Sequence, residues 1–251
     1  RADAKRELYA ALEPRLGPDA LLTTNTSSIP LEELRGQIAR PAQFAGLHYF
    51  NPVAQMPLVE VVRASETDDA AYATAFAVAR ACGKSAIAVA DRPGFVVNRL
   101  LVRLLGEVLG SLEDGTDVET ADAALRPLGL PMGPFQLLQL VGPAVAKHVL
   151  DTLRDNLGER YPTSPGLDRM VADGATFVTF EGRPTAASPV DPTIGSYFGS
   201  RAGNAQSADE LLGRVRDALS QEVGLMMDEQ VVTDTDDIDL AMILGAGWPF
   251  H

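Results

Sequence analysis

The first part of the chain alternates between short apolar runs and segments with helical periodicity. The periodic segments predict helices over residues 5–16, 30–38 and 69–81. The apolar runs predict strands over residues 21–24, 44–50, 58–62 and 86–90. Because strands that alternate with helices are typical of an α/β layer, we expect this part of the chain to form an α/β domain.

The pattern changes at Pro93-Gly94, which interrupts the chain. No strand-like run follows for a long stretch, and this predicts a second, all-α domain. Its first helix should span residues 95–112, where Arg99, Arg103 and Glu107 form one polar stripe on an otherwise apolar surface. A helix of this kind is buried on several sides, and another subunit is one candidate for the surface that covers it.

The last part of the chain combines an irregular stretch with a repeat. Residues 161–207 carry five prolines with many Gly and Ser, which predicts irregular structure or a linker. Helical periodicity returns at Ala208. Residues 222–249 then resemble residues 107–131, because both open with Glu-Val, pass through an acidic turn and an Asp-x-Ala step, and become Gly-rich before a proline. This predicts a degenerate repeat whose two helical units stack their apolar faces.

Composition narrows the classes of function. A formal net charge of −13 argues against a surface that neutralises nucleic-acid phosphates. Charged residues interrupt the longest apolar run, and the first residues form no apolar signal region, so we expect no membrane span and a cytoplasmic protein. Cys82 is the only cysteine, which excludes an intrachain disulfide and a thiolate cluster. We expect a buried structural thiol there, and we predict no metal site.

Small hydroxyl residues follow the first predicted strand. Asn25-Thr26-Ser27-Ser28 comes directly after residues 21–24. The carboxyl end of a strand in an α/β sheet is where ligands usually bind. Alternatively, Ser28 is a helix N-cap with Pro30 in the first turn. The spacing alone leaves both interpretations open.

A histidine and a glutamate stand out in the next two strands. His48 lies near the end of an apolar run, just before Asn51-Pro52, where it can exchange protons near neutral pH; alternatively, it is a core or turn histidine. Glu60 lies inside an apolar strand, where a buried carboxylate is costly unless it is paired. A histidine partner would satisfy Glu60, fix the imidazole tautomer and support the imidazolium. The alternative is that Glu60 faces solvent from an edge strand.

A third candidate lies where the chain enters the first helix of the second domain. Asn98 follows the segment Asp91–Val97 and should lie on the first turns of that helix. Its amide would then be directed back towards the domain junction. The alternative is an ordinary polar residue on the flank of the helix.

Four motifs together resemble the catalytic signature of the 3-hydroxyacyl-CoA dehydrogenases. In chain order they are NTSS at 25–28, GLHYFNP at 46–52, MPLVEVV at 56–62 and DRPGFVVNR at 91–99. Leu130–Phe135 also resembles a motif of that family's helical domain, so the resemblance covers nearly the whole chain. The Met56-Pro57 variant and the second helical copy, which ends at Trp248-Pro249-Phe250, are similar to the dehydrogenase part of bacterial multifunctional fatty-acid oxidation proteins.

The resemblance implies a fold and an activity. The fold would be an α/β partial Rossmann-like domain followed by an all-α helical domain with a degenerate internal repeat. Residues 1–91 would be the C-terminal half of the NAD-binding domain, residues 92–185 the first helical C-terminal domain, and residues 186–251 a linker and a partial second repeat. The activity would be NAD-dependent oxidation of (S)-3-hydroxyacyl-CoA to 3-oxoacyl-CoA in fatty-acid β-oxidation. The assembly would be a homodimer or part of a multifunctional β-oxidation complex.

The motifs also assign residues to this reaction. His48 would be the general base that takes the proton of the 3-hydroxyl, and Glu60 would orient and support it. Ser27 would contact substrate and cofactor, and Asn98 would hold the acyl-CoA near its reacting carbons. These four residues form the expected catalytic and substrate-binding set.

The cofactor side is the least complete part. Lys5, Ser27 and Asn51 would lie near NAD, but no Gly-x-Gly-x-x-Gly turn opens a helix after a first strand. We therefore expect both ends to be missing from a longer gene product, and the chain alone to bind NAD weakly or not at all. An anionic CoA thioester would need a local basic pocket, to which Lys5, Arg92 and Arg99 are candidate contributors.

Two further interpretations stay open. One is a 3-hydroxybutyryl-CoA dehydrogenase specialised for short chains, because the motifs do not determine chain length. The other is a non-catalytic remnant or assembly module, which the missing glycine-rich loop would suggest. The complete set of His48, Glu60 and Asn98 favours an enzyme over such a remnant.

Overall fold

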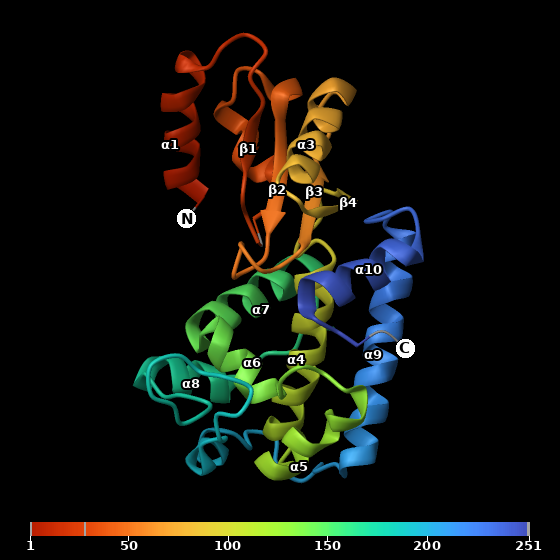
Figure 1. Ribbon diagram of the computed structural model, residues 1–251. Helices are drawn as coiled ribbons and strands as arrows, with labels where there is room; N and C mark the ends of the chain where they lie inside the picture. The colour runs from red at the N-terminus through yellow and green to blue at the C-terminus, as the bar shows by residue number, and fades with distance from the viewer. Residues whose placement is uncertain (1, 28, 250–251) are drawn as a thin grey trace. The chain divides into compact units, whose positions relative to one another are not determined.

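The computed structural model describes residues 2–27 and 29–249, and it divides into two compact units (Figure 1). The first unit consists of Arg1–Asn98 with Leu225–Ala246, and the second of Arg99–Gly224 with Gly247–His251. The predicted order of an α/β domain followed by a helical domain is confirmed. The predicted boundaries after residues 91 and 185 stay a prediction.

The elements follow one another in this order. Those that begin in the first unit are α1 (Ala2–Leu12), η1 (Glu13–Arg15), β1 (Leu22–Thr24), α2 (Leu31–Leu34), η2 (Arg35–Gln37), η3 (Pro41–Gln43), β2 (Phe44–Tyr49), β3 (Leu58–Arg63), α3 (Asp69–Ala81), β4 (Ser85–Ala90), α4 (Val97–Glu113) and α10 (Thr235–Ala246). Those that begin in the second are α5 (Val118–Ala124), η4 (Arg126–Leu128), α6 (Pro134–Val141), α7 (Pro143–Leu157), α8 (Pro165–Asp173), η5 (Pro192–Tyr197) and α9 (Ala208–Asp228).

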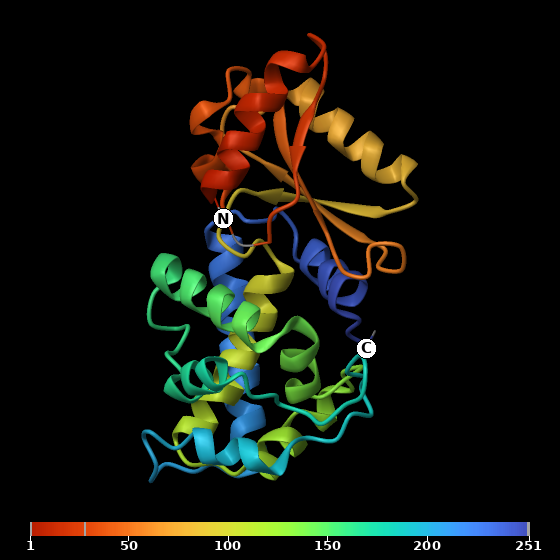
Figure 2. The ribbon, with the colours of Figure 1, turned by 90° about the vertical axis from the view of Figure 1, so that its left-hand side faces the viewer.

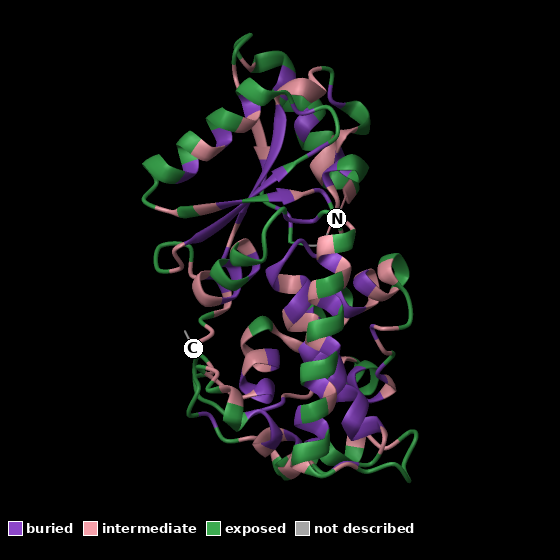
Figure 3. Ribbon diagram, turned by 90° about the vertical axis from the view of Figure 1, so that its right-hand side faces the viewer, coloured by how far each residue is buried: buried purple, intermediate pink, exposed green. Residues whose placement is uncertain are grey.

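The first unit is built on a sheet with the strand order β1-β2-β3-β4. β1 pairs parallel with β2, β2 antiparallel with β3, and β3 parallel with β4. The two central strands are buried on both faces, as their continuous apolar sequences predict, and Figure 3 shows this burial along the sheet. All four predicted strands are present, with ends that differ by a residue or two.

Alternation along the central strands separates the two faces of the sheet. Ala45, Leu47, Val59 and Val61 form one apolar cluster with Ala75 and Ala79 of α3. The residues between them, His48 and Glu60 included, therefore point to the opposite face. Figures 1 and 2 show α1 and α3 on opposite sides of the sheet. The face that carries His48 is thus the one that α3 leaves open to the segments on the other side.

The chain returns to the first unit near its end. The Ala90 N–H donates to the Val231 carbonyl at 2.8 Å. α10 then packs on β3 and β4, where a Cβ on Gly245 would stand 2.6 Å from Leu58 Cδ2 and 2.9 Å from Val97 Cγ2. Glycine is therefore needed where α10 approaches the sheet.

In the second unit, α9 covers the polar stripe of α4. Glu222 pairs with the fully buried Arg99, and Arg214 of α9 pairs with Glu107. These two pairs run in opposite order along the helices, so α4 and α9 lie antiparallel. The predicted burial of α4 is confirmed, and a helix of the same chain provides this cover. Arg99 is committed to this pairing, so the expectation that it helps to bind CoA is wrong.

Two other sequence-based expectations need correction. The stretch 161–207 is not irregular throughout, because α8 forms where the Ser164 hydroxyl accepts the Leu167 N–H and Pro165 stands in the first turn. Cys82 is exposed, because it lies just past the end of α3, where the apolar face of that helix no longer continues.

The predicted repeat agrees with the order of elements. Residues 107–131 contain the end of α4, a turn and α5, and residues 222–249 contain the end of α9, a turn and α10. Ser28 and Phe250 lie outside the described residues, so the predicted N-cap role of Ser28 is not addressed. Of the helices described, none has the length and apolar character needed to cross a bilayer.

Candidate active site

The register of the β2–β3 ladder brings His48 opposite Glu60. Their side chains share one face of the sheet, and His48 Nδ1 lies 2.5 Å from Glu60 Oε2. His48 is 3% exposed and Glu60 is 0% exposed. The interpretation in which Glu60 faces solvent is therefore wrong. A shift of one residue in this register would turn one of the two side chains to the other face.

The second carboxylate oxygen of Glu60 is also occupied. Oε1 accepts the backbone N–H groups of Val96 and Val97, each at 3.0 Å. These groups lie at the start of α4, where the helix dipole favours a negative charge. Glu60 is thus a buried carboxylate whose partners hold it in one orientation, and whose ionised form the structure is built to accept.

These contacts define what the imidazole can do. Because Glu60 accepts at Nδ1, that nitrogen carries a proton and Nε2 is left as the acceptor. Ser27 Oγ lies 3.1 Å from Nε2. The rings of Phe50 and Phe95 flank the imidazole, with centroids 4.6 Å and 5.5 Å away. The result is an oriented base with its free nitrogen directed towards Ser27.

Asn98 and Ser27 are also brought together. Asn98, the second residue of α4, donates from Nδ2 to the Ser27 carbonyl at 3.0 Å. Ser27 therefore contacts His48 through its hydroxyl and Asn98 through its backbone. The sequence analysis placed all three residues in one site without indicating this contact.

The sequence analysis missed one residue of this neighbourhood. Asp91 follows β4, and its carboxylate accepts the N–H groups of Leu31 and Glu32 at 2.7 Å and 2.8 Å. Burial raises the pKa of the Asp91 carboxyl, while these two backbone hydrogen bonds lower it by a smaller amount. The available signal was Pro30, since a proline before a helix offers no side-chain cap of its own.

The proposed cofactor residues lie at the carboxyl ends of β1 and β2. Lys5 Nζ donates to the Asn25 carbonyl at 3.1 Å, and this links α1 to the segment that carries Ser27. Asn51 is exposed in the turn after β2. Because β1 and β2 are parallel, both segments lie at the same edge of the sheet, where ligands bind in such folds.

These residues fit one end of a dinucleotide. The amide of Asn51 and the hydroxyl of Ser27 offer donors and acceptors suited to a nicotinamide and its ribose. Before β1, the described part of the chain supplies only α1 and η1, without a glycine-rich turn for the diphosphate. Among the described residues, no group of three or more His, Cys, Asp or Glu could hold a metal ion.

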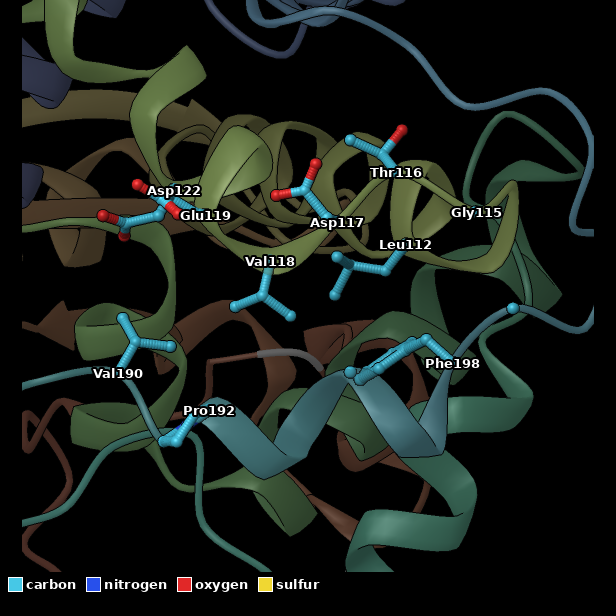
Figure 4. A pocket seen from close by; sticks show the side chains of 12 residues that line it. Leu112, Gly115, Thr116, Asp117, Val118, Glu119, Asp122, Val190, Pro192 and Phe198 are labelled. Carbon is cyan, nitrogen blue, oxygen red and sulfur yellow. The ribbon is translucent and has the colours of Figure 1, made fainter.

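A cavity of about 690 Å³ lies elsewhere, within the second unit. Figure 4 shows Val118 on one side of it, with Pro192 and Phe198 on the other. Asp117 and Glu119 stand at its rim. None of the residues that line it belongs to the His48 neighbourhood.

Comparison with known proteins supplies the family. Residues 1–92 match the family described as the 3-hydroxyacyl-CoA dehydrogenase NAD-binding domain, and residues 94–179 match the corresponding C-terminal domain. The chain belongs to the 3-hydroxyacyl-CoA dehydrogenase family, with a Rossmann-like α/β domain followed by a helical domain.

Particular relatives agree with this assignment. The chain is 32% identical over 252 residues to the fatty acid oxidation complex subunit alpha of Shewanella sp. strain W3-18-1, an alignment that covers 98% of this chain and 36% of that protein. The corresponding subunit of Shewanella halifaxensis is 34% identical, again over 36% of its length. The chain thus spans about a third of these relatives.

Solved structures show the same fold. The 3-hydroxybutyryl-CoA dehydrogenase of Escherichia coli K12 superposes with a TM-score of 0.81 at 24% identity, covering 99% of this chain and 70% of that one. FadB2 of M. tuberculosis superposes with a TM-score of 0.68 at 38% identity, covering 72% of this chain and 68% of that one.

Proposed function

We propose that this chain supplies the catalytic base of an NAD-dependent dehydrogenase that oxidises (S)-3-hydroxyacyl-CoA to 3-oxoacyl-CoA in fatty-acid β-oxidation. The observation that carries the proposal is the buried pair of His48 and Glu60, with 2.5 Å between Nδ1 and Oε2. The family assignment supports it. An oriented imidazole with a free nitrogen is what removal of an alcohol proton requires.

The residues of the chain have separate roles in this reaction. His48 accepts the 3-hydroxyl proton at Nε2, while C3 loses a hydride and its C–O bond becomes a carbonyl. Glu60 stabilises the imidazolium that forms and holds the ring in place. Ser27 Oγ, at 3.1 Å from Nε2, is positioned to bind the same hydroxyl. NAD, when bound, supplies the acceptor for the hydride.

Binding of the substrate and the cofactor involves the neighbouring polar groups. Asn98 holds the acyl-CoA near its reacting carbons, in part by fixing the Ser27 backbone. Asn51 and Ser27 contact the nicotinamide end of NAD. Lys5 acts on the same side by holding the Asn25 carbonyl.

The test measures NADH formation from (S)-3-hydroxybutyryl-CoA by the gene product that contains this chain. His48→Gln should lower kcat by about 10²-fold or more, because the general base is removed. His148→Gln is the matched control, since His148 is exposed on α7. Equal activity of the His48→Gln variant and the unmodified protein would show that the base is misassigned.

A second arm addresses substrate length and the alternative of an assembly module. Comparison of kcat/KM for four-carbon and longer acyl-CoA substrates separates a short-chain enzyme from a general β-oxidation enzyme. A folded gene product that oxidises none of them would support the non-catalytic module.

We place the protein in the cytoplasm, in a multifunctional β-oxidation complex or as a homodimer. The similarity to fatty acid oxidation complex subunits supports the first assembly. Light scattering of the purified gene product, alone and with co-purifying subunits, distinguishes the two.

A further inference from the structure

We infer that Asp91 is a positioning residue for the proposed reaction, which it serves by fixing Ser27 against His48. The inference rests on the proposed function. It assigns a role in catalysis to a carboxylate that touches neither His48 nor Glu60 in the contacts described above. Its two partners are the backbone N–H groups of Leu31 and Glu32.

The short helix α2 depends on Asp91 for its cap. Pro30 stands at the N-cap position, and no side chain of the local sequence bonds to the first turn. The Asp91 carboxylate accepts both Leu31 and Glu32 N–H groups, from a distance of 60 and 59 residues along the chain. Two short hydrogen bonds to an ionised acceptor hold the start of α2 firmly. The segment that precedes α2, which carries Ser27, is thereby anchored at its end.

Asp91 itself is held on a rigid part of the fold. It directly follows β4 and is 8% exposed. The turn that begins beside it leads to Val96 and Val97, whose N–H groups bind Glu60. One position therefore connects the base's carboxylate partner and the segment that carries Ser27.

These contacts close a ring around His48. Ser27 Oγ lies 3.1 Å from His48 Nε2, and Asn98 binds the Ser27 carbonyl at 3.0 Å. Glu60 links His48 back to the start of α4, which carries Asn98. Asp91 holds the Ser27 segment at the point where no other member of this ring does. Loss of its carboxylate should misplace the Ser27 hydroxyl and leave the imidazole bound to Glu60.

The test is a double-mutant cycle in the gene product that contains this chain. Asp91→Asn keeps one acceptor oxygen and places an NH2 group against the second N–H. It should lower kcat about tenfold and change KM for the acyl-CoA little, because the reacting hydroxyl is misaligned while most binding contacts remain. In a Ser27→Ala background the same change should lower kcat by less than about twofold, because Asp91 acts through Ser27.

Asp68→Asn is the matched control. Asp68 is the N-cap of α3, where its carboxylate accepts the Ala71 N–H at 2.6 Å, and α3 carries no residue of the site. This variant should leave kcat unchanged. If Asp91→Asn does not fold, the cycle is run with Asp91→Glu, which keeps the charge but moves the carboxylate, and the same non-additivity with Ser27→Ala is expected.

Three outcomes separate the possibilities. Non-additive effects of Asp91 and Ser27 on kcat, with an unchanged Asp68 control, support the inference. Multiplying effects of the two changes, or an unchanged kcat when Asp91 is replaced, overturn it. Undiminished activity of His48→Gln would instead overturn the proposed function, whatever the Asp91 variants do.

Discussion

Glu60 and His48 face each other across an antiparallel pair of strands, and the carboxylate of Glu60 also receives the first turn of α4. Each carboxylate oxygen therefore has its own task. Oε2 binds the imidazole, and Oε1 binds two backbone N–H groups that fix where the carboxylate points. The pair is an arrangement in which neither member can turn away alone.

Replacement of Glu60 by Gln should therefore abolish most of the activity. The amide cannot stabilise the imidazolium, and its NH2 group must face either the Nδ1 proton or the N–H groups of Val96 and Val97. We expect kcat to fall by about 10²-fold or more, measured as NADH formation by the gene product that contains this chain. Glu181→Gln, at an exposed position of the second unit, is the control. A folded Glu60→Gln variant with kcat within about threefold of the unmodified protein would contradict this role.

The ion pairs between α4 and α9 lead to a prediction about stability. Glu222→Ala leaves the buried Arg99 without its carboxylate, and it also removes the partner of Arg160, 2.9 Å away. The free energy of unfolding should fall by about 3–5 kcal/mol, the usual cost of breaking a buried pair on one side. Denaturant unfolding followed by circular dichroism measures it. Arg126→Ala, which removes a pair whose arginine is 72% exposed, should cost less than about 1 kcal/mol. Similar losses for both variants would refute the distinction.

The contact of α10 with the sheet predicts opposite effects of one substitution at two glycines. Gly245→Ala should destabilise the protein by about 1–3 kcal/mol, because the new methyl group would overlap Leu58 and Val97. Gly213→Ala lies within α9 with no atom within 4 Å of the new Cβ, so it should stabilise by about 0.5–1 kcal/mol. Thermal unfolding of the two variants provides the comparison. Stabilisation by Gly245→Ala would show that α10 does not approach the sheet this closely.

The N-cap of α5 predicts a dependence on pH. Hydrogen bonds from the Thr120 backbone and hydroxyl lower the pKa of Asp117 below its usual value of 3.8. The unfolded chain therefore takes up this proton at a higher pH than the folded protein does. The contribution of Asp117 to stability is complete above 3.8 and is lost as the pH falls through the lowered pKa.

Asp117→Ala should thus cost about 1 kcal/mol at neutral pH, and the difference from the unmodified protein should shrink in acid. Unfolding by urea across an acid pH series measures this difference. Asp117→Asn keeps an acceptor but cannot titrate, so the difference between the Asn and Ala variants should stay constant. A loss that grows as the pH falls would contradict the assignment.

The sequence was sufficient for the elements and for the main members of the site. Burial on both faces made the central strands continuous apolar runs, so the polar residues inside them were conspicuous. His48 and Glu60 were found in this way, and their pairing was expected from the cost of burying a lone carboxylate. The register that places them opposite each other depends on the whole sheet, and no local pattern specifies it.

Backbone partners were the part that the sequence could not reveal. Asp91 binds two N–H groups, and such groups exist at every residue except proline, so no side-chain pattern marks them. The partners of Arg99 were hidden for a related reason. Glu222 lies 123 residues further along the chain, and only the folded second unit brings the two together.

The return of α10 to the first unit has a consequence for how the protein is made. Leu58 and the start of α4 leave the ribosome long before Gly245, which packs against them. During translation, this side of the sheet stays uncovered while the entire second unit is being synthesised between the two halves of the first. A nascent chain that stalls within that interval carries the catalytic histidine on an unfinished domain, which chaperones and proteases can reach.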